Sequence, residues 1–343
     1  MKHWLTRLFG SAGQTAQQPA STSSAPSAPS APAGRATAAH THAPRALDLA
    51  FQRWLTDPVR GDASPAAEAA ILAGLERLAA DPAAAGELVP RVPAVVPQLL
   101  RSLRDDSVSG SELARQIARD TVLVAEVIRD ANSPWFRSGK PVTTIDGAVR
   151  VLGENGLRIL LARVAFRPII NMQGGRVVRA VAPRLWQQSD ACALAASLVA
   201  PDLGADPFEA YLAGLVLNVG LMAACRLIDH LEQPLVPQSD AFCTALQAHA
   251  RELSAGIASH WELPPFVAAA VVRAGRPGTQ PLAACLGQAD ALAKLRLLVD
   301  HGVLTLDDVR NDAHSDAGDG AALALLLEGP AGRHFARLAA GSG

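Results

Sequence analysis

The stretch Tyr211–Gly220, YLAGLVLNVG, decides the fold of this chain. It lies in a longer apolar stretch, Pro207–Leu231, which is interrupted at Gly214 and at Asn218–Gly220. Apolar and polar residues do not alternate in it, so the pattern favours a buried helix over a strand. We therefore predict a core helix that ends in a turn at Asn218–Gly220.

Helical patterns of the same kind extend in both directions from this stretch. No convincing alternating pattern accompanies them, so the predicted fold class is all-α. Capping and helix-breaking residues set the ends: Pro183 begins a helix that stops before Pro201, and Thr144 caps a short helix that Gly153 ends. The predicted helices are Ala46–Leu55, Pro65–Ala80, Thr144–Leu152, Leu157–Phe166, Pro183–Ala200, Ala241–His260, Phe266–Ala274, Pro281–Val299 and Ala321–Ala340, with two more between Ser109 and Ala131.

Shifts in composition divide the chain into five parts. Residues 1–10 form a short amphipathic segment, and residues 11–45, rich in Ala, Pro and Ser, are predicted to be a disordered linker. A helical preface (46–87), in which no residue is expected to carry chemistry, leads to a compact multi-helix domain (88–300) and a C-terminal helical extension (301–343). The first segment is either a weak docking helix for a membrane or a partner, or a frayed terminus; its apolar residues are Trp4, Leu5, Leu8 and Phe9.

Charge and cysteine content exclude several classes of function. The formal charge is −1, with no basic stretch of the kind that nucleic-acid binding requires. The four cysteines are widely separated within apolar helical patterns, which is typical of buried free thiols in a reducing compartment. No apolar run reaches the roughly 18–20 residues of a membrane span without a charge or breaker, and no secretory signal is recognisable. We therefore expect a cytoplasmic protein.

Seven stretches, in order, resemble the HDOD domain, a bacterial relative of the HD phosphohydrolases found in signalling proteins. The resemblance covers about residues 90 to 300 and implies a helical domain with a cleft between its helices. The stretches are VPAVVPQLLRSL at 92–103, DTVLVAEVIRDANSPWF at 120–136, PVTTIDGAVRVLG at 141–153, LWQQS at 185–189, AYLAGLVLNVG at 210–220, HWELPPFVAAAV at 260–271 and LGQADALAKL at 286–295.

The resemblance also implies where metal ligands would lie in a catalytic relative. Such relatives carry a histidine after the Leu-Trp element, an adjacent His-Asp pair and a later aspartate, which together bind a divalent metal. The corresponding residues here are Gln188, Leu217-Asn218 and Asp290. Leucine has no lone pair to offer a metal and asparagine offers only a neutral oxygen, so we expect a vestigial pocket without metal or other cofactor.

Recruited histidines do not repair this loss. Many relatives have two histidines after the Trp-x-Leu-Pro element, where this chain has Ala274-Gly275. His249 and His260 are eleven residues apart on one predicted helix, about 16 Å by helical rise, so they cannot share one metal ion. A catalytic site would have to be built from other residues.

Three functions follow from this pattern as hypotheses. The first is a non-catalytic bacterial regulatory module, a pseudoenzyme that acts by protein interaction or ligand sensing. The second is a divergent metal-dependent phosphohydrolase or nucleotide phosphodiesterase that uses Asp290 with recruited ligands. The third is a pocket that binds a nucleotide without cleaving it, through Gln188 and Asn218.

Overall fold

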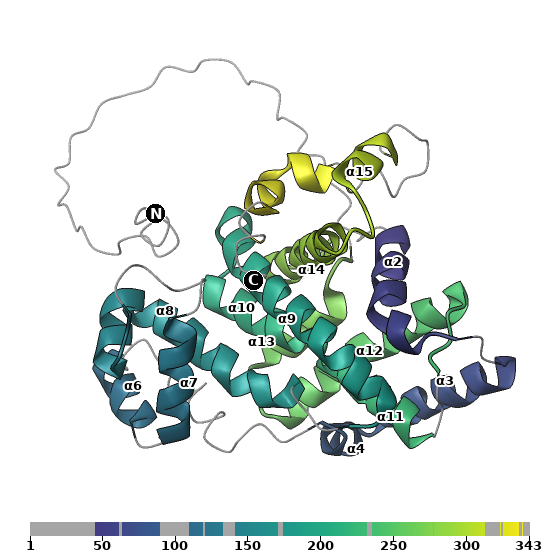
Figure 1. Ribbon diagram of the computed structural model, residues 1–343, viewed down its shortest axis with the longest axis horizontal. Helices are drawn as coiled ribbons and strands as arrows, with labels where there is room; N and C mark the ends of the chain where they lie inside the picture. The colour runs from purple at the N-terminus through teal and green to yellow at the C-terminus, as the bar shows by residue number, and fades with distance from the viewer. Residues whose placement is uncertain are drawn as a thin grey trace, which may run out of the picture.

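The computed structural model describes residues 45–61, 64–89, 110–118, 121–132, 141–170, 174–231, 235–276 and 278–312, and parts of 323–338. These residues form helices and no strand, which confirms the all-α class; the one isolated parallel bridge joins Arg60 to Val236. The long helices lie across one another in a compact arrangement (Figure 1). They are α2 (Arg45–Thr56), α3 (Pro65–Ala80), α4 (Pro82–Glu87), α6 (Gly110–Ile117), α7 (Thr121–Ala131), α8 (Ile145–Ile170), α9 (Arg176–Leu203), α10 (Pro207–Val216), α11 (Val219–His230), α12 (Asp240–His260), α13 (Pro265–Arg273), α14 (Pro281–Asp300) and α15 (Leu306–Asp312), with 3-10 helices η1 (Asp57–Val59) and η2 (Pro330–His334).

The centre of the molecule is the packing of α9 against α10 and α14. Small residues allow the close approach: a Cβ at Gly214 of α10 would lie 2.5 Å from the Cα of Ala193 on α9. On the α14 side, the thiol of Cys285 lies 3.2 Å from the carbonyl oxygen of Ala196. The sequence prediction that YLAGLVLNVG is core is confirmed, since Tyr211–Val216 is buried throughout.

The start of α9 differs from the sequence prediction. The helix begins at Arg176, seven residues before the predicted start at Pro183, and continues through Pro201 to Leu203. The reason is tertiary, because Asp229 on α11 caps it: Oδ1 accepts from the Val177 amide at 2.9 Å and Oδ2 from the Val178 amide at 3.1 Å. No local sequence signal reveals a cap supplied from another helix.

Most other boundaries agree with the local signals. Ser64 caps α3, and Thr144 accepts from the Gly147 amide as the predicted cap. Gly153 adopts φ 69°, a left-handed conformation, and ends the first of two helices there, as predicted. The second helix follows directly, and the label α8 covers both helices and the kink between them. The predicted segment 92–103 and Ser109, where the next predicted helix begins, lie outside the described residues.

One stretch, Pro207–His230, is long and apolar enough to cross a membrane by composition alone. Of its most apolar window, 83% is buried inside the fold, and the turn at Leu217–Asn218 divides the stretch into α10 and α11. Burial inside the fold and division by a turn are both typical of core helices.

The C-terminal part only partly follows the prediction of one helix over Ala321–Ala340. Among its described residues, the α-helix stops at Gly329 and the 3-10 helix η2 follows, so the prediction of a single helix is wrong. Pro330 explains the break, because its ring cannot continue an α-helical hydrogen-bond pattern. At the other end, the predicted segment 1–10 and residues 11–44 of the predicted linker 11–45 lie outside the described residues, and Arg45 already belongs to α2.

Candidate functional site

The four residues predicted to form a vestigial pocket lie together in the structure. Leu217 and Asn218 form the turn between α10 and α11, Gln188 lies in the middle of α9, and Asp290 lies in the middle of α14. Three of the four line a cavity of about 30 Å³, which holds about one or two water molecules. The lining residues are Phe51, Gln52, Leu217, Asn218, Leu221, Gln247, Ala250, Arg251, Asp290 and Lys294.

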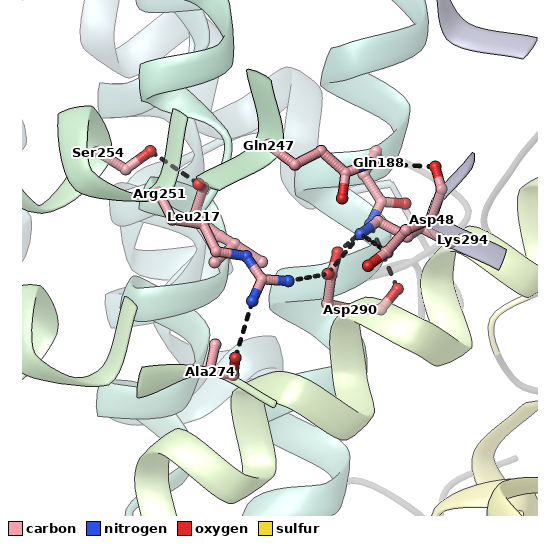
Figure 2. A network of polar contacts seen from close by, with 9 residues as sticks. All are labelled: Asp48, Gln188, Leu217, Gln247, Arg251, Ser254, Ala274, Asp290 and Lys294. Carbon is pink, nitrogen blue, oxygen red and sulfur yellow. Dashed lines mark hydrogen bonds and ion pairs between the residues drawn. The ribbon is translucent and has the colours of Figure 1, made fainter. Parts of the chain in front are cut away.

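Asp290 is the centre of this arrangement (Figure 2). Its carboxylate is only 2% exposed and accepts a hydrogen bond from the Gln188 amide nitrogen at Oδ1, at 2.8 Å. The Nζ of Lys294 lies 2.7 Å from its other oxygen, Oδ2, and the guanidinium of Arg251 lies 3.5 Å from Oδ2. Both carboxylate oxygens of the predicted metal ligand are therefore already engaged by groups of the protein.

Lys294 is held as a charged group in the buried site. It lies one helical turn after Asp290, and its Nζ lies 2.6 Å from Oδ1 of Asp48 as well as 2.7 Å from Oδ2 of Asp290. Burial alone would lower the pKa of the Lys294 ammonium, but the charges of Asp290 and Asp48 outweigh it and raise that pKa above its usual value. The ring of Phe51 adds a cation–π contact, with Nζ 5.6 Å from the ring centroid.

Asp48 is the functional-site residue that the sequence prediction missed. It belongs to α2, in the preface that was expected to carry no chemistry, and α2 packs against α14 and α12 beside the cavity. The Gln247 side-chain amide on α12 donates to the backbone carbonyl of Asp48 at 3.0 Å. The spacing of Asp290 and Lys294 was visible in the sequence as an i, i+4 pair, but nothing in the sequence joins Asp48 to them.

The turn at Leu217–Asn218 is fixed by one serine. Ser254 Oγ on α12 donates to the Leu217 carbonyl at 2.8 Å (Figure 2). The same oxygen accepts from the Gly220 amide at 2.8 Å. A Cβ at Gly220 would collide with the Ala250 carbonyl oxygen, so only glycine allows α11 this close to α12. Leu217 is buried, and Asn218 Nδ2 is buried without a hydrogen-bond partner among the described residues.

These residues do not fit a divalent metal. The position of the His-Asp pair provides an apolar side chain and a neutral amide, and the remaining carboxylate already holds a protonated lysine. Within the described part of the chain, no three His, Cys, Asp or Glu residues are grouped closely enough to hold a metal ion. His249 and His260 lie on the single helix α12, as predicted, and neither lines the cavity.

The fold and this cavity first define a class of protein: an all-α domain with a buried lysine–aspartate pair between its helices. The chain belongs to the HDOD domain family, because the family's sequence model matches residues 89–277, more than half of its 343 residues. HDOD is a signalling-associated, HD-like domain.

Individual proteins match this chain only at low sequence identity. An uncharacterized protein of Treponema pallidum (strain Nichols) is 25% identical over 190 residues, which is 51% of this chain and 35% of that protein. This chain therefore spans about a third of the length of that curated relative.

Solved structures share the fold. The crystal structure of an HDOD domain protein of unknown function from Geobacter sulfurreducens has a TM-score of 0.53 and 21% identity, over 86% of this chain and 89% of that one. A protein from Shewanella amazonensis SB2B, whose name proposes a phosphohydrolase, has a TM-score of 0.53 and 22% identity, over 78% of this chain and 96% of that one. At this level of identity the likeness shows the fold and not the chemistry.

Proposed function

We propose that this HDOD domain is a non-catalytic regulatory module of a bacterial signalling pathway, located in the cytoplasm, that acts by binding a protein partner. One observation carries the non-catalytic part: the ammonium of Lys294 is ion-paired to Asp290, the only carboxylate among the four positions that match metal ligands. A domain that catalyses no reaction in its cavity can still bind a partner through the outer surfaces of its helices.

The electrostatics of the cleft support this proposal. Its charged groups are two carboxylates, Asp48 and Asp290, and two cations, Arg251 and Lys294, so the charges already balance. A divalent ion at Asp290 would have to displace Lys294 or lie beside it, and repulsion between cations is strong in a buried environment. A metal-dependent phosphohydrolase activity is therefore disfavoured.

The size of the cavity argues against the nucleotide-sensing alternative. A volume of about 30 Å³ is far below the several hundred cubic ångströms that typical small-molecule sites offer. Gln188, which was expected to bind a nucleotide, instead donates to Asp290. Protein recognition is thus the better supported form of regulation.

Metal content tests the non-catalytic proposal. The purified full chain, saturated with Mn²⁺, Fe²⁺ or Mg²⁺ and then desalted, should retain well under one equivalent by elemental analysis, and Asp290→Ala should retain the same amount. One tightly bound equivalent that Asp290→Ala abolishes, together with hydrolysis of a phosphodiester by the wild type alone, would establish the phosphohydrolase alternative.

A separate experiment tests the protein partner. Proteins captured on the full chain from an extract of its native bacterium should include one that, once purified, binds the full chain with defined stoichiometry by calorimetry. If no purified protein binds, while a small molecule copurifies in stoichiometric amount, ligand sensing replaces protein interaction as the function.

A further inference from the structure

The cavity beside Lys294 contains two buried polar atoms that no described residue satisfies. Gln52 on α2 is 1% exposed and lines the cavity, and its Oε1 has no hydrogen-bond partner within the described part of the chain. Asn218, at the turn before α11, lines the same cavity, and its Nδ2 is also buried without a partner among the described residues. Because a buried polar atom without a hydrogen bond is destabilising, the two atoms together indicate a bound ligand.

The two atoms have opposite hydrogen-bonding roles. Oε1 of Gln52 accepts a hydrogen bond, and Nδ2 of Asn218 donates one. An anion in the cavity would satisfy Asn218 alone, and a metal cation would satisfy Gln52 alone. A ligand that satisfies both atoms must therefore donate and accept.

Charge and volume restrict the ligand further. The two cations beside the cavity, Arg251 and Lys294, are balanced by the carboxylates of Asp48 and Asp290. A neutral ligand is favoured, because an added ion would be a buried charge without compensation. The cavity volume of about 30 Å³ exceeds the roughly 10–15 Å³ that one water needs, and it leaves no room for a larger polar molecule.

On this basis we propose that the cavity is a binding site for ordered water, which bridges Gln52 Oε1 to Asn218 Nδ2 and so joins α2 to the turn between α10 and α11. Lys294 supplies a third partner, since its ammonium has three N–H groups and Asp48 and Asp290 accept two of them. Three hydrogen bonds are the usual number for a buried water. The proposal goes beyond the proposed function, because the bridge needs neither a metal nor a protein partner.

A double-mutant cycle tests the bridge in solution. Gln52→Met and Asn218→Leu each replace a polar group by an apolar one of similar size, and each removes one end of the bridge. Each should lower the melting temperature of the full chain. The double variant should lose at least about 1 °C less than the sum of the two single losses, because either change alone already breaks the bridge.

Gln238→Met is the matched control for this cycle. Gln238 also has a buried Oε1 that no described residue satisfies, but it does not line the cavity. Its effect on the melting temperature should therefore add to that of Asn218→Leu. Additive effects of Gln52→Met and Asn218→Leu, or single variants of these two that melt above the wild type, would overturn the proposal, because the two atoms would then be independent or unsatisfied.

Nuclear magnetic resonance detects the water directly and does not require a variant to fold. In the wild-type full chain, nuclear Overhauser effects should connect a long-lived water to the side-chain amide protons of Asn218. The same effects should disappear in Gln52→Met. Absence of these effects in the wild type would refute the water site. Neither measurement depends on metal content or partner capture, so the failure of this proposal is distinguishable from the failure of the proposed function.

Discussion

The Nζ of Lys294 lies 2.7 Å from the Oδ2 of Asp290, one helical turn away on α14, and both side chains are almost fully buried. The lysine gives the aspartate the positive charge that a metal would supply in a catalytic relative. The charges in the cavity are therefore balanced without any bound ion. The following predictions depend on this pair and on the helices around it.

Removal of the lysine charge should strongly destabilise the fold. Lys294→Met leaves Asp290 with only the Gln188 amide and the more distant Arg251, so we expect a loss of about 3–5 kcal/mol in the free energy of unfolding. Urea denaturation followed by circular dichroism measures it. Asp290→Leu/Lys294→Met should recover most of the loss, since no unpaired charge remains, and a double variant as unstable as Lys294→Met would contradict the argument.

Metal binding should need removal of Lys294. Gln188→His/Leu217→His/Asn218→Asp restores the ligand types that the resemblance implies, but the ammonium remains at Asp290. We expect no Mn²⁺ binding by calorimetry in this triple variant, and binding only after Lys294→Ala is added. The pair Leu217→His/Asn218→Asp alone should also fail, because Gln188 is still no ligand. Tight binding by the triple variant with Lys294 intact would show that the lysine does not block the site.

The Ser254 bridge should be essential for the turn at Leu217–Asn218. Ser254→Ala removes two buried hydrogen bonds at once and leaves the Gly220 amide and Leu217 carbonyl without this partner, which should cost about 2–4 kcal/mol. Thermal unfolding provides the comparison. Ser259→Ala, on the same helix, removes a bond only to its own helix backbone and should cost far less. Similar losses in the two variants would argue against the bridge.

The early start of α9 should depend on Asp229. Asp229→Ala leaves the Val177 and Val178 amides uncapped, with an expected loss of about 1–2 kcal/mol. Hydrogen exchange should become faster over the first turn of α9 and remain unchanged at its C-terminal end. Asp229→Asn keeps one acceptor and should give an intermediate effect. Unchanged exchange at Val177 and Val178 in Asp229→Ala would show that the cap is dispensable.

Stability should fall at alkaline pH because of the buried thiols. Burial raises the pKa of Cys225 and of Cys285 to about 12, whereas the unfolded thiols ionise near pH 9. The folded state then keeps protons that the unfolded state loses, so stability is complete below about pH 9 and declines above it, by up to about 1.4 kcal/mol per pH unit for each thiol. Denaturation at several pH values measures how steeply the free energy of unfolding falls with pH in the wild type and in Cys225→Ala/Cys285→Ala. Equal slopes in the two proteins would refute this cause.

Local sequence signals predicted the helices well where the deciding group lies nearby in the chain. Pro65, Thr144 and the proline at the start of α14 each act within one turn of their own helix, so a single sequence contains the necessary information. The same signals placed the start of α9 wrongly, because Pro183 is tolerated inside a helix whose true cap, Asp229, lies about fifty residues further on.

The sequence by itself determined the all-α fold and the buried stretch at Tyr211–Gly220, because the hydrophobic pattern is a property of each position. It also shows that Gln188, Leu217 and Asn218 stand where the resemblance implies metal ligands. Only the tertiary structure showed which groups surround Asp290. Lys294 serves as a cation because the packing of α2 and α14 brings Asp48 and Asp290 to its two sides, and an ion pair between such distant residues depends on distance in space.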